Sequence, residues 1–382
     1  MKRIASLLFA IALLCGCLMV ASAAESPAHA GLQCKPDGSF KIIQVSDLQE
    51  FLISSTISAQ FLYDLAKNEK PDLFVLTGDN VSTGAAAYFP GNLGRAAVRL
   101  SIDGMMRAFD RIYRDFGIPV TMVFGNHDNE AGPDCVSRAE QFAMYAAHES
   151  FIGYYIPGAD EGTDDEQGQH YGTHNLLVYD RWGEAPVFNL WMFDSGSYDE
   201  RGGYSCVQEP QIAWFNETNE ALGALPSISF QHIIVPEIYG FLTPDKKLPE
   251  GTNGVMREDP CPGQYNDGQF AAMEEAGSVL AMFFGHDHVN TFELRREGVD
   301  LVNSPGSGFG SYGDIDLRGV RVITLHEGNP GAYGTYCVFY QSYYSGPLRG
   351  ARLRMFQALG STATLIDIFT FNPLLWAMGL FR

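Results

Sequence analysis

The chain has 382 residues and a formal charge of −20, with 46% hydrophobic and 18% charged residues. That length allows one large core or two modest domains. The acidic balance argues against nucleic acid as the main partner, because such partners need a Lys/Arg patch and no long basic run is present. It also repels phosphate substrates unless bound cations reverse the local field, so a metal site would aid attraction as well as chemistry.

The N-terminus has the features of an export signal. Lys2 and Arg3 precede an uncharged, largely apolar stretch, and Ala21-Ser22-Ala23 supplies small residues for cleavage. We therefore predict a signal peptide over residues 1–24. Two alternatives remain open, namely a lipobox ending at Cys17 and an uncleaved anchor. Each of these three interpretations predicts an exported protein, which is either secreted or associated with the cell envelope.

Five cysteines lie outside this leader, and no two of them form a Cys-x-x-Cys pair. They are Cys34, Cys135, Cys206, Cys261 and Cys337. Zinc-finger and thioredoxin interpretations therefore fail. Up to two disulfides are compatible with an oxidising compartment, and the sequence does not give their pairing.

Strand-like and helix-like segments alternate along the chain. Strands are predicted at 40–45, 72–76, 119–124, 175–179, 187–193, 227–232 and 279–284, and helices at 55–68, 96–115, 210–222 and 267–276. From Thr291 onward the pattern predicts short strands and turns. The fold class is α/β or α+β with a mixed sheet.

The C-terminal tail, residues 346–382, is unusually apolar. Between Met355 and Phe381 the only charged residue is Asp367. This length is sufficient to span a bilayer, but a central aspartate costs about 2.5–3.5 kcal/mol there. We expect the tail to pack on the preceding domain, with membrane insertion or interfacial docking as the alternative.

Five polar motifs each follow a predicted strand, where open α/β sheets place their ligand-binding loops. They are Ser46-Asp47-Leu48-Gln49, Thr77-Gly78-Asp79-Asn80, Phe124-Gly125-Asn126-His127-Asp128, Gln231-His232 and Phe284-Gly285-His286-Asp287-His288. Singly, most have a structural explanation: a Gly-Asp at a strand end is usually a turn, and a lone histidine is usually in the core. Together they form a mixed oxygen and nitrogen ligand set that suits two ions of the Mn, Fe or Zn type.

This order of motifs resembles the calcineurin-like metallophosphoesterase superfamily over residues 40 to about 326. The segments 193–197, 236–237 and 266–270 further resemble the purple-acid-phosphatase-29-like branch. The resemblance implies a four-layer α/β/β/α sandwich with mixed sheets, within a phosphoesterase domain at 25–345. It also implies two divalent or trivalent metal ions (Mn, Fe or Zn).

The resemblance assigns roles motif by motif. The first metal would be bound by Asp47, Gln49, Asp79 and His288, and the second by Asp79, Asn126, His232 and His286. Asp79 would thus bridge the two ions. His127 would stabilise the substrate phosphate or protonate the leaving oxygen, and Asp128 would orient it.

Two positions depart from the family pattern. Gln49 stands where many relatives have His, and a neutral amide oxygen is a weaker, harder ligand that favours Mn or Fe over Zn. Ser82 stands where purple enzymes carry a metal-bound Tyr, so no purple colour is expected.

Other candidates are weaker. Ser195 lacks a Gly-x-Ser-x-Gly context, and no His-Glu-x-x-His is present, which argues against a serine hydrolase and the common zinc proteases. His174 precedes a strand, and its alternatives are a position in the core and a reach into the cleft.

The leading hypothesis is hydrolysis of a phosphorylated small molecule by a metal-activated hydroxide. Monoesters are favoured over diesters through the branch resemblance only. The alternatives are a phosphodiesterase acting on lipid head groups or nucleotides, and a non-catalytic surface protein that retains the fold. We expect a monomer that does not bind nucleic acid.

Overall fold

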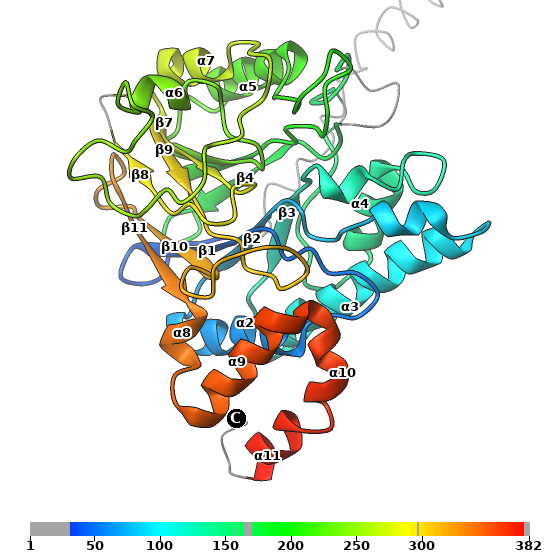
Figure 1. Ribbon diagram of the computed structural model, residues 1–382. Coiled ribbons are helices and arrows are strands. Elements are labelled where there is room, and N and C mark those ends of the chain that lie inside the picture. The colour runs from blue at the N-terminus through cyan, green and yellow to red at the C-terminus, as the bar shows by residue number, and fades with distance from the viewer. Residues whose placement is uncertain (1–30, 157, 164–169, 296–297, 378–382) are drawn as a thin grey trace, which may run out of the picture. The chain divides into compact units, whose positions relative to one another are not determined.

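The computed structural model describes residues 31–382, except 157, 164–169, 296–297 and 378–382. The predicted signal peptide and the alternative lipobox at Cys17 lie outside these residues. Two mixed sheets form the centre of the described chain (Figure 1). The predicted α/β class is therefore confirmed.

The first sheet has the strand order β11-β10-β1-β2-β3. Its strands are β1 (Ser39–Val45), β2 (Leu73–Thr77), β3 (Val120–Val123), β10 (Gly319–His326) and β11 (Tyr333–Phe339). The strands β1, β2 and β3 run parallel, while β10 is antiparallel to both of its neighbours. The carboxyl ends of β1, β2 and β3 therefore meet along one edge.

The second sheet has the order β4-β5-β6-β7-β9-β8. Its strands are β4 (His174–Tyr179), β5 (Pro186–Met192), β6 (Ser227–Phe230), β7 (Val279–Phe284), β8 (Glu293–Leu294) and β9 (Asp300–Asn303). The four central strands are parallel, and the two edge strands are antiparallel to them.

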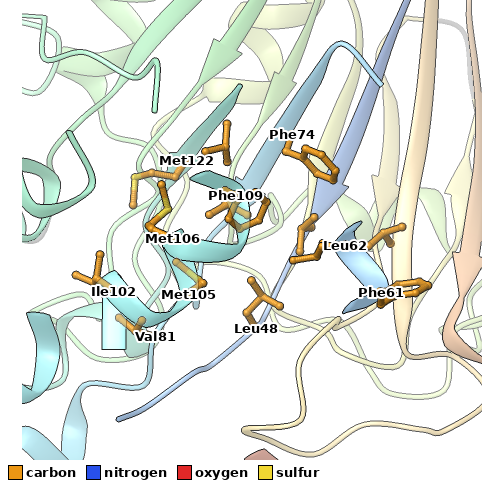
Figure 2. Packing of buried hydrophobic residues seen from close by; sticks show 14 of the residues in the cluster. Leu48, Phe61, Leu62, Phe74, Val81, Ile102, Met105, Met106, Phe109 and Met122 are labelled. Carbon is orange, nitrogen blue, oxygen red and sulfur yellow. The ribbon is translucent and has the colours of Figure 1, made fainter. Parts of the chain in front are cut away.

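Helices α2 (Thr56–Glu69) and α3 (Leu93–Phe116) cover the outer face of the first sheet (Figure 1). In α2 the Ser55 hydroxyl accepts a hydrogen bond from the Ser58 N–H as the N-cap, and Lys70 ends the helix in a left-handed conformation. Figure 2 shows Phe61 of α2 and Phe109 of α3 in the same apolar cluster as Phe74 of β2. Burial of this apolar face is what orders both helices.

Helices α5 (Glu209–Ala221) and α7 (Gln269–Ala276) cover the second sheet. Trp191 of β5 packs edge-on against Phe215 of α5, with ring centroids 4.8 Å apart. In Figure 1 these helices lie above the strands, whereas α2 and α3 lie below them. The arrangement is the expected α/β/β/α sandwich.

Polar side chains join the two sheets near their carboxyl edges. The Gln44 amide on β1 donates to the Phe284 carbonyl on β7 (3.1 Å) and to the Thr77 hydroxyl on β2 (3.0 Å). Arg321 of β10, also fully buried, donates to the carbonyl oxygens of Thr291 and Asn303. Since buried donors need partners, these contacts define how the strand ends of the two sheets meet.

The remaining helices lie in the connections and in the C-terminal tail. They are η1 (Gly84–Tyr88), η2 (His127–Asn129), α4 (Arg138–Ala146), α6 (Ile238–Phe241), α8 (Tyr340–Tyr343), α9 (Pro347–Leu359), η3 (Gly360–Ala363), α10 (Thr364–Asp367) and α11 (Phe371–Ala377). The expectation of strands and turns after Thr291 is confirmed up to β11 but is wrong beyond it. There, helices interrupted by Gly360 are held by contacts with α2 that sequence periodicity does not reveal.

The first part of the apolar tail packs on the domain. Leu353, Phe356 and Ala363 belong to the same buried cluster as Phe61. Asp367 is fully buried and accepts hydrogen bonds from the Arg352 guanidinium (2.8 and 2.7 Å) and from the Thr56 hydroxyl. Among the described residues, no helix is both long enough and apolar enough to cross a membrane.

We expect Asp367→Asn to destabilise the protein by about 3–5 kcal/mol, because it leaves the buried Arg352 charge without its counterion. Urea unfolding monitored by circular dichroism measures this change. Arg114→Gln is the control: it removes an exposed pair with Glu149 and should cost less than about 1 kcal/mol. Equal effects for the two variants would contradict the assigned role of the buried pair.

Candidate metal centre

Polar side chains from both sheets converge where the parallel strands end. Asp47 and Asp79 follow β1 and β2, Asn126 follows β3, His232 follows β6, and His286 follows β7. Hydrogen bonds tie the loops together, from the Asp47 N–H to the Gly78 carbonyl (3.1 Å) and from the Gly285 N–H to the His232 carbonyl (3.1 Å). Segments far apart in sequence thus form one cluster, at the edge where such sheets bind ligands.

Four of these loop residues adopt left-handed backbone conformations that L-residues rarely occupy. The φ angles are 55° at Asp47, 47° at Gln49, 50° at Asp79 and 71° at His286. Such conformations cost of order 1–3 kcal/mol each and tend to cluster at functional sites. Here they lie in the turns that directly follow β1, β2 and β7.

Close packing requires glycine beside these turns. A Cβ on Gly125 would lie 2.3 Å from the Asp79 Oδ1 atom, and one on Gly285 would lie 1.8 Å from the Ser46 Oγ atom. Any larger residue would displace the carboxylate-bearing loops. The glycines of the third and fifth motifs therefore make room for their neighbours.

Two groups of side chains have the spacing needed to hold a cation. One comprises Asp79, His232 and His286, the other Asp47, Asp79 and His288, and within each group the ligand atoms lie within 4.8 Å of one another. Asp79 belongs to both. The structure therefore brings together five of the seven predicted ligands around one shared carboxylate.

The other two predicted ligands lie beside these groups. The Asn126 Oδ1 atom is 3.2 Å from His232 Nε2, which in turn lies 3.2 Å from His286 Nδ1. The Gln49 amide donates to Asp79 Oδ2 over 3.1 Å. Asn126 already turns its amide oxygen toward the cluster. Gln49 turns its amide nitrogen toward Asp79, so its amide would have to rotate to offer an oxygen.

Hydrogen bonds orient two of the imidazoles. His232 Nδ1 lies 2.9 Å from the Thr77 carbonyl oxygen, and His288 Nδ1 lies 2.9 Å from the Tyr312 carbonyl oxygen. A carbonyl only accepts, so each Nδ1 carries the proton when the ring is neutral, and each Nε2 keeps its lone pair. This is the usual outer support of a metal-binding histidine.

Two buried atoms in the cluster lack hydrogen-bond partners, namely Asp47 Oδ1 and His286 Nε2. Asp47 Oδ1 is 3.2 Å from His288 Nε2, but the contact does not have hydrogen-bond geometry. Buried polar atoms are nearly always paired, so unpaired ones need an explanation. Cations would supply it, and the donor set of carboxylate, amide and imidazole fits ions of the Mn, Fe or Zn type.

The charges of the cluster are strongly coupled. Burial lowers the pKa of His232, but Asp79 and Asp47 outweigh it and raise that pKa to about 10. Burial and the adjacent His232 lower the pKa of His286 to about 3. Burial opposes ionisation of Asp47 and Asp79, yet the facing histidines hold both pKa values below normal. The carboxylates and imidazoles of the cluster therefore influence one another's protonation, and a cation would bind the deprotonated forms.

His127 lies at the rim rather than inside the cluster. Its backbone N–H donates to Asp79 Oδ1 (2.8 Å), while its side chain is 37% exposed. Its Nδ1 atom is 2.7 Å from Glu130 Oε1, and Nε2 is 3.9 Å from Asp79 Oδ2. The Glu130 hydrogen bond outweighs partial burial and, with Asp79, raises the pKa of His127 to about 9.

The predicted role of Asp128 in orienting His127 is contradicted. The fully buried Asp128 carboxylate accepts hydrogen bonds from the backbone N–H groups of Val81 (2.9 Å), Gly125 (2.8 Å) and Asn80 (3.3 Å). It thereby ties the loop after β3 to the loop after β2. Although Asp128 is next to His127 in the sequence, its carboxylate faces inward, away from the His127 ring. The ring instead contacts Glu130.

Sequence analysis missed several residues around the cluster. Tyr198 Oη accepts a hydrogen bond from the Asn126 amide (3.4 Å), and the Tyr204 ring meets His286 edge-on at 4.3 Å. The buried Arg138 bonds Asp194 and the Gly125 carbonyl oxygen, which supports the third motif. The only sequence signal was the segment 193–197, which ends directly before Tyr198.

His174 does not reach the cluster. It is fully buried, with Nε2 2.9 Å from the Thr121 hydroxyl and Nδ1 2.7 Å from the Gly172 carbonyl oxygen. Burial lowers its pKa to about 4, so the ring is neutral. Of its two predicted alternatives, the core position is correct.

Comparisons with known proteins identify relatives of this chain. The family described as "Calcineurin-like phosphoesterase" matches residues 40–290. "Probable inactive purple acid phosphatase 14" of Arabidopsis thaliana is 30% identical over 76% of both chains. "Probable inactive purple acid phosphatase 29" of the same plant is 26% identical over 86% of this chain and 88% of its own.

The chain is also similar to a solved dimetal phosphatase from Danio rerio, with 14% identity and a TM-score of 0.48. That similarity covers 78% of this chain and 98% of the other. The predicted resemblance to the superfamily and to its purple-acid-phosphatase-like branch is confirmed by the family match and by the two plant relatives.

We expect Asp79→Asn to weaken cation binding at both groups and His288→Ala to weaken it at one, because only Asp79 is shared. Isothermal titration with Mn²⁺ and elemental analysis after dialysis measure the stoichiometry. His326→Gln, at the end of β10, is the control and should bind as the parent does. Undiminished stoichiometry in Asp79→Asn would contradict the assigned groups.

Proposed function

Because the chain belongs to the calcineurin-like phosphoesterase family, we propose that it hydrolyses phosphate esters at the centre described above. The observation that carries the proposal is the pair of Asp/His groups joined by Asp79. Two cations sharing one carboxylate is the arrangement that binds a phosphoryl group and activates water. The unpaired Asp47 and His286 atoms support the same assignment.

The proposed ligand sets follow the grouping of side chains. Asp47, Gln49 and His288 would hold one ion, and Asn126, His232 and His286 the other, with Asp79 common to both. When bound, the ions would supply charge neutralisation for the phosphate and a nucleophile at neutral pH. In a chain with a formal charge of −20, they would also make the site attractive to an anionic substrate.

His127 is proposed as the residue that contacts the reacting phosphoryl group. Its ring is partly exposed at the rim, its backbone N–H is bonded to Asp79, and the adjacent Glu130 carboxylate raises its pKa. A protonated imidazole there stabilises negative charge on the phosphate oxygens or donates a proton to the leaving oxygen. Asp128 supports this only indirectly, through the loop backbone.

Monoesters are the proposed substrates, on the branch resemblance alone. The rim presents aromatic rings on two sides of the cluster: Tyr198 beside Asn126, and Tyr312 stacked on His288 with ring centroids 4.1 Å apart. Both tyrosines are more than 40% exposed. They would contact the group that carries the phosphate.

A non-catalytic protein that binds cations in the same fold is the second candidate. Two observations favour it: Gln49 stands where many relatives have His, and the plant relatives carry names that describe them as probably inactive. The partly exposed His127 side chain beside Asp79 favours the enzyme, because cation binding alone does not require an imidazole at the rim.

We expect hydrolysis of p-nitrophenyl phosphate, faster than of the bis ester, when Mn, Fe or Zn is supplied separately. Asp79→Ala and His286→Ala should each lose at least about 100-fold in kcat, since metal stabilisation is worth several kcal/mol and each 1.36 kcal/mol is tenfold. His326→Gln is the matched control. Undiminished metal-dependent turnover in Asp79→Ala would refute the proposal, and cation binding without turnover in the parent would favour the second candidate.

We expect Gln49→His to raise affinity for Zn²⁺ relative to Mn²⁺ by about tenfold or more, because imidazole is a softer ligand than an amide oxygen. Competition titrations with a chromophoric chelator give the ratio for parent and variant. Gln60→His is the control, since this half-buried residue of α2 lies outside the cluster and its amide donates to Asp64. An unchanged ratio would show that position 49 does not contact the ion.

A further inference from the structure

Glu130 makes the shortest side-chain contact with His127. Its Oε1 atom lies 2.7 Å from His127 Nδ1, three residues away on the turn that follows the third motif. Both side chains are partly exposed, at 37% for His127 and 30% for Glu130. An imidazole nitrogen beside a carboxylate at this distance carries a proton and donates it in a charge-assisted hydrogen bond.

The turn that carries this pair is fixed from several directions. The Thr83 N–H donates to the His127 carbonyl (3.1 Å), and the Ala131 N–H donates to the Thr83 hydroxyl (3.0 Å). The Gln141 amide donates to the Asp128 carbonyl (2.8 Å). The backbone on both sides of Glu130 is therefore held in place. The Glu130 carboxylate and the His127 ring meet within this one turn.

Gly84 provides the space for the second carboxylate oxygen. A Cβ on Gly84 would lie only 2.8 Å from Glu130 Oε2. The φ angle of Gly84 is not in the left-handed region, so the backbone there accommodates an alanine. The nearest atoms that the added methyl group would meet all belong to the Glu130 side chain. This gives a way to displace Glu130 without replacing it.

With Nδ1 occupied, the free nitrogen of the His127 ring is Nε2, which lies on the side of Asp79. We propose that Glu130 is the positioning residue of the proposed phosphoesterase reaction, holding His127 so that its Nε2 atom faces the leaving oxygen of the bound ester. This rests on the proposed function. The orienting task expected of Asp128 is thus performed two residues later, by the carboxylate that shares the rim with the ring.

The contact itself is tested without turnover. In ¹⁵N-histidine-labelled protein, we expect a slowly exchanging, downfield Nδ1 proton that disappears in His127→Gln and in Glu130→Ala. Glu149→Gln, which replaces another partly exposed carboxylate, should leave it unchanged. A signal that persists in Glu130→Ala would overturn the proposal, whatever the activity of the protein.

The role in catalysis is tested with two esters. Phenyl phosphate needs a proton on its leaving oxygen far more than p-nitrophenyl phosphate does, and general acid catalysis contributes about 10²–10⁴-fold. We expect Glu130→Ala to lose about 10–100-fold in kcat on phenyl phosphate and under about threefold on p-nitrophenyl phosphate. Gly84→Ala should show the same pattern in weaker form. Glu130→Gln, which keeps an acceptor for Nδ1–H, should recover part of the loss.

Coupling to His127 completes the test. If Glu130 acts through the ring, the His127→Ala and Glu130→Ala losses will not multiply, and the double variant will match His127→Ala. Equal losses on the two esters, or multiplying losses, would reduce Glu130 to a structural role and overturn the proposal. A parent protein that hydrolyses neither ester with any metal would remove the proposed function and the catalytic part with it, while the proton signal would still report the contact.

Discussion

The Asp79 carboxylate is the point on which the centre depends. One oxygen accepts the His127 backbone N–H, and the other faces the Gln49 amide and His232 Nε2 at 3.1 and 3.3 Å. It follows β2, the middle of the three parallel strands in the first sheet, and it meets the second sheet through His232 at the end of β6. A left-handed backbone at Asp79 and a glycine at 125 allow this approach. The flanking strands β1 and β3 hold β2 in place, and this surrounding structure keeps the turn at Asp79 in its strained conformation.

The electrostatics of the centre are dominated by two buried carboxylates, those of Asp47 and Asp79. The two carboxylates are buried, and the histidines that face them hold the pKa of Asp47 low while the carboxylates raise the pKa of His232. Bound cations would add positive charge there and turn a negative surface into a site for phosphate. The fully buried arginines act elsewhere: Arg138 on the Gly125 carbonyl, Arg321 between the sheets, and Arg352 on Asp367. Arg138 and Arg321 position strands and loops that carry the ligands, whereas Arg352 holds the C-terminal helices together.

The two acidic residues that follow His127 divide the work that a single one was expected to do. Asp128 faces inward and joins the loops after β2 and β3 through backbone N–H groups, whereas Glu130 faces outward and meets the ring. The 3₁₀ turn between them accounts for this, because residues three apart lie on the same side of such a turn and adjacent residues do not. Supporting the loop and orienting the ring are therefore separable.

The sequence by itself determined the strand ends, the order of the five motifs and the candidate ligands, since apolar strands followed by Gly, Asp, Asn and His are local patterns. It also indicated the layered fold, through the resemblance that those motifs carry. It did not determine what depends on side chains distant in sequence. The partnership of Glu130 with His127, the burial of His174, and the pairing of Asp367 with Arg352 each depend on how elements pack. Only the tertiary structure decided these, because hydrogen-bond geometry and burial depend on where the side chains lie after the two sheets meet.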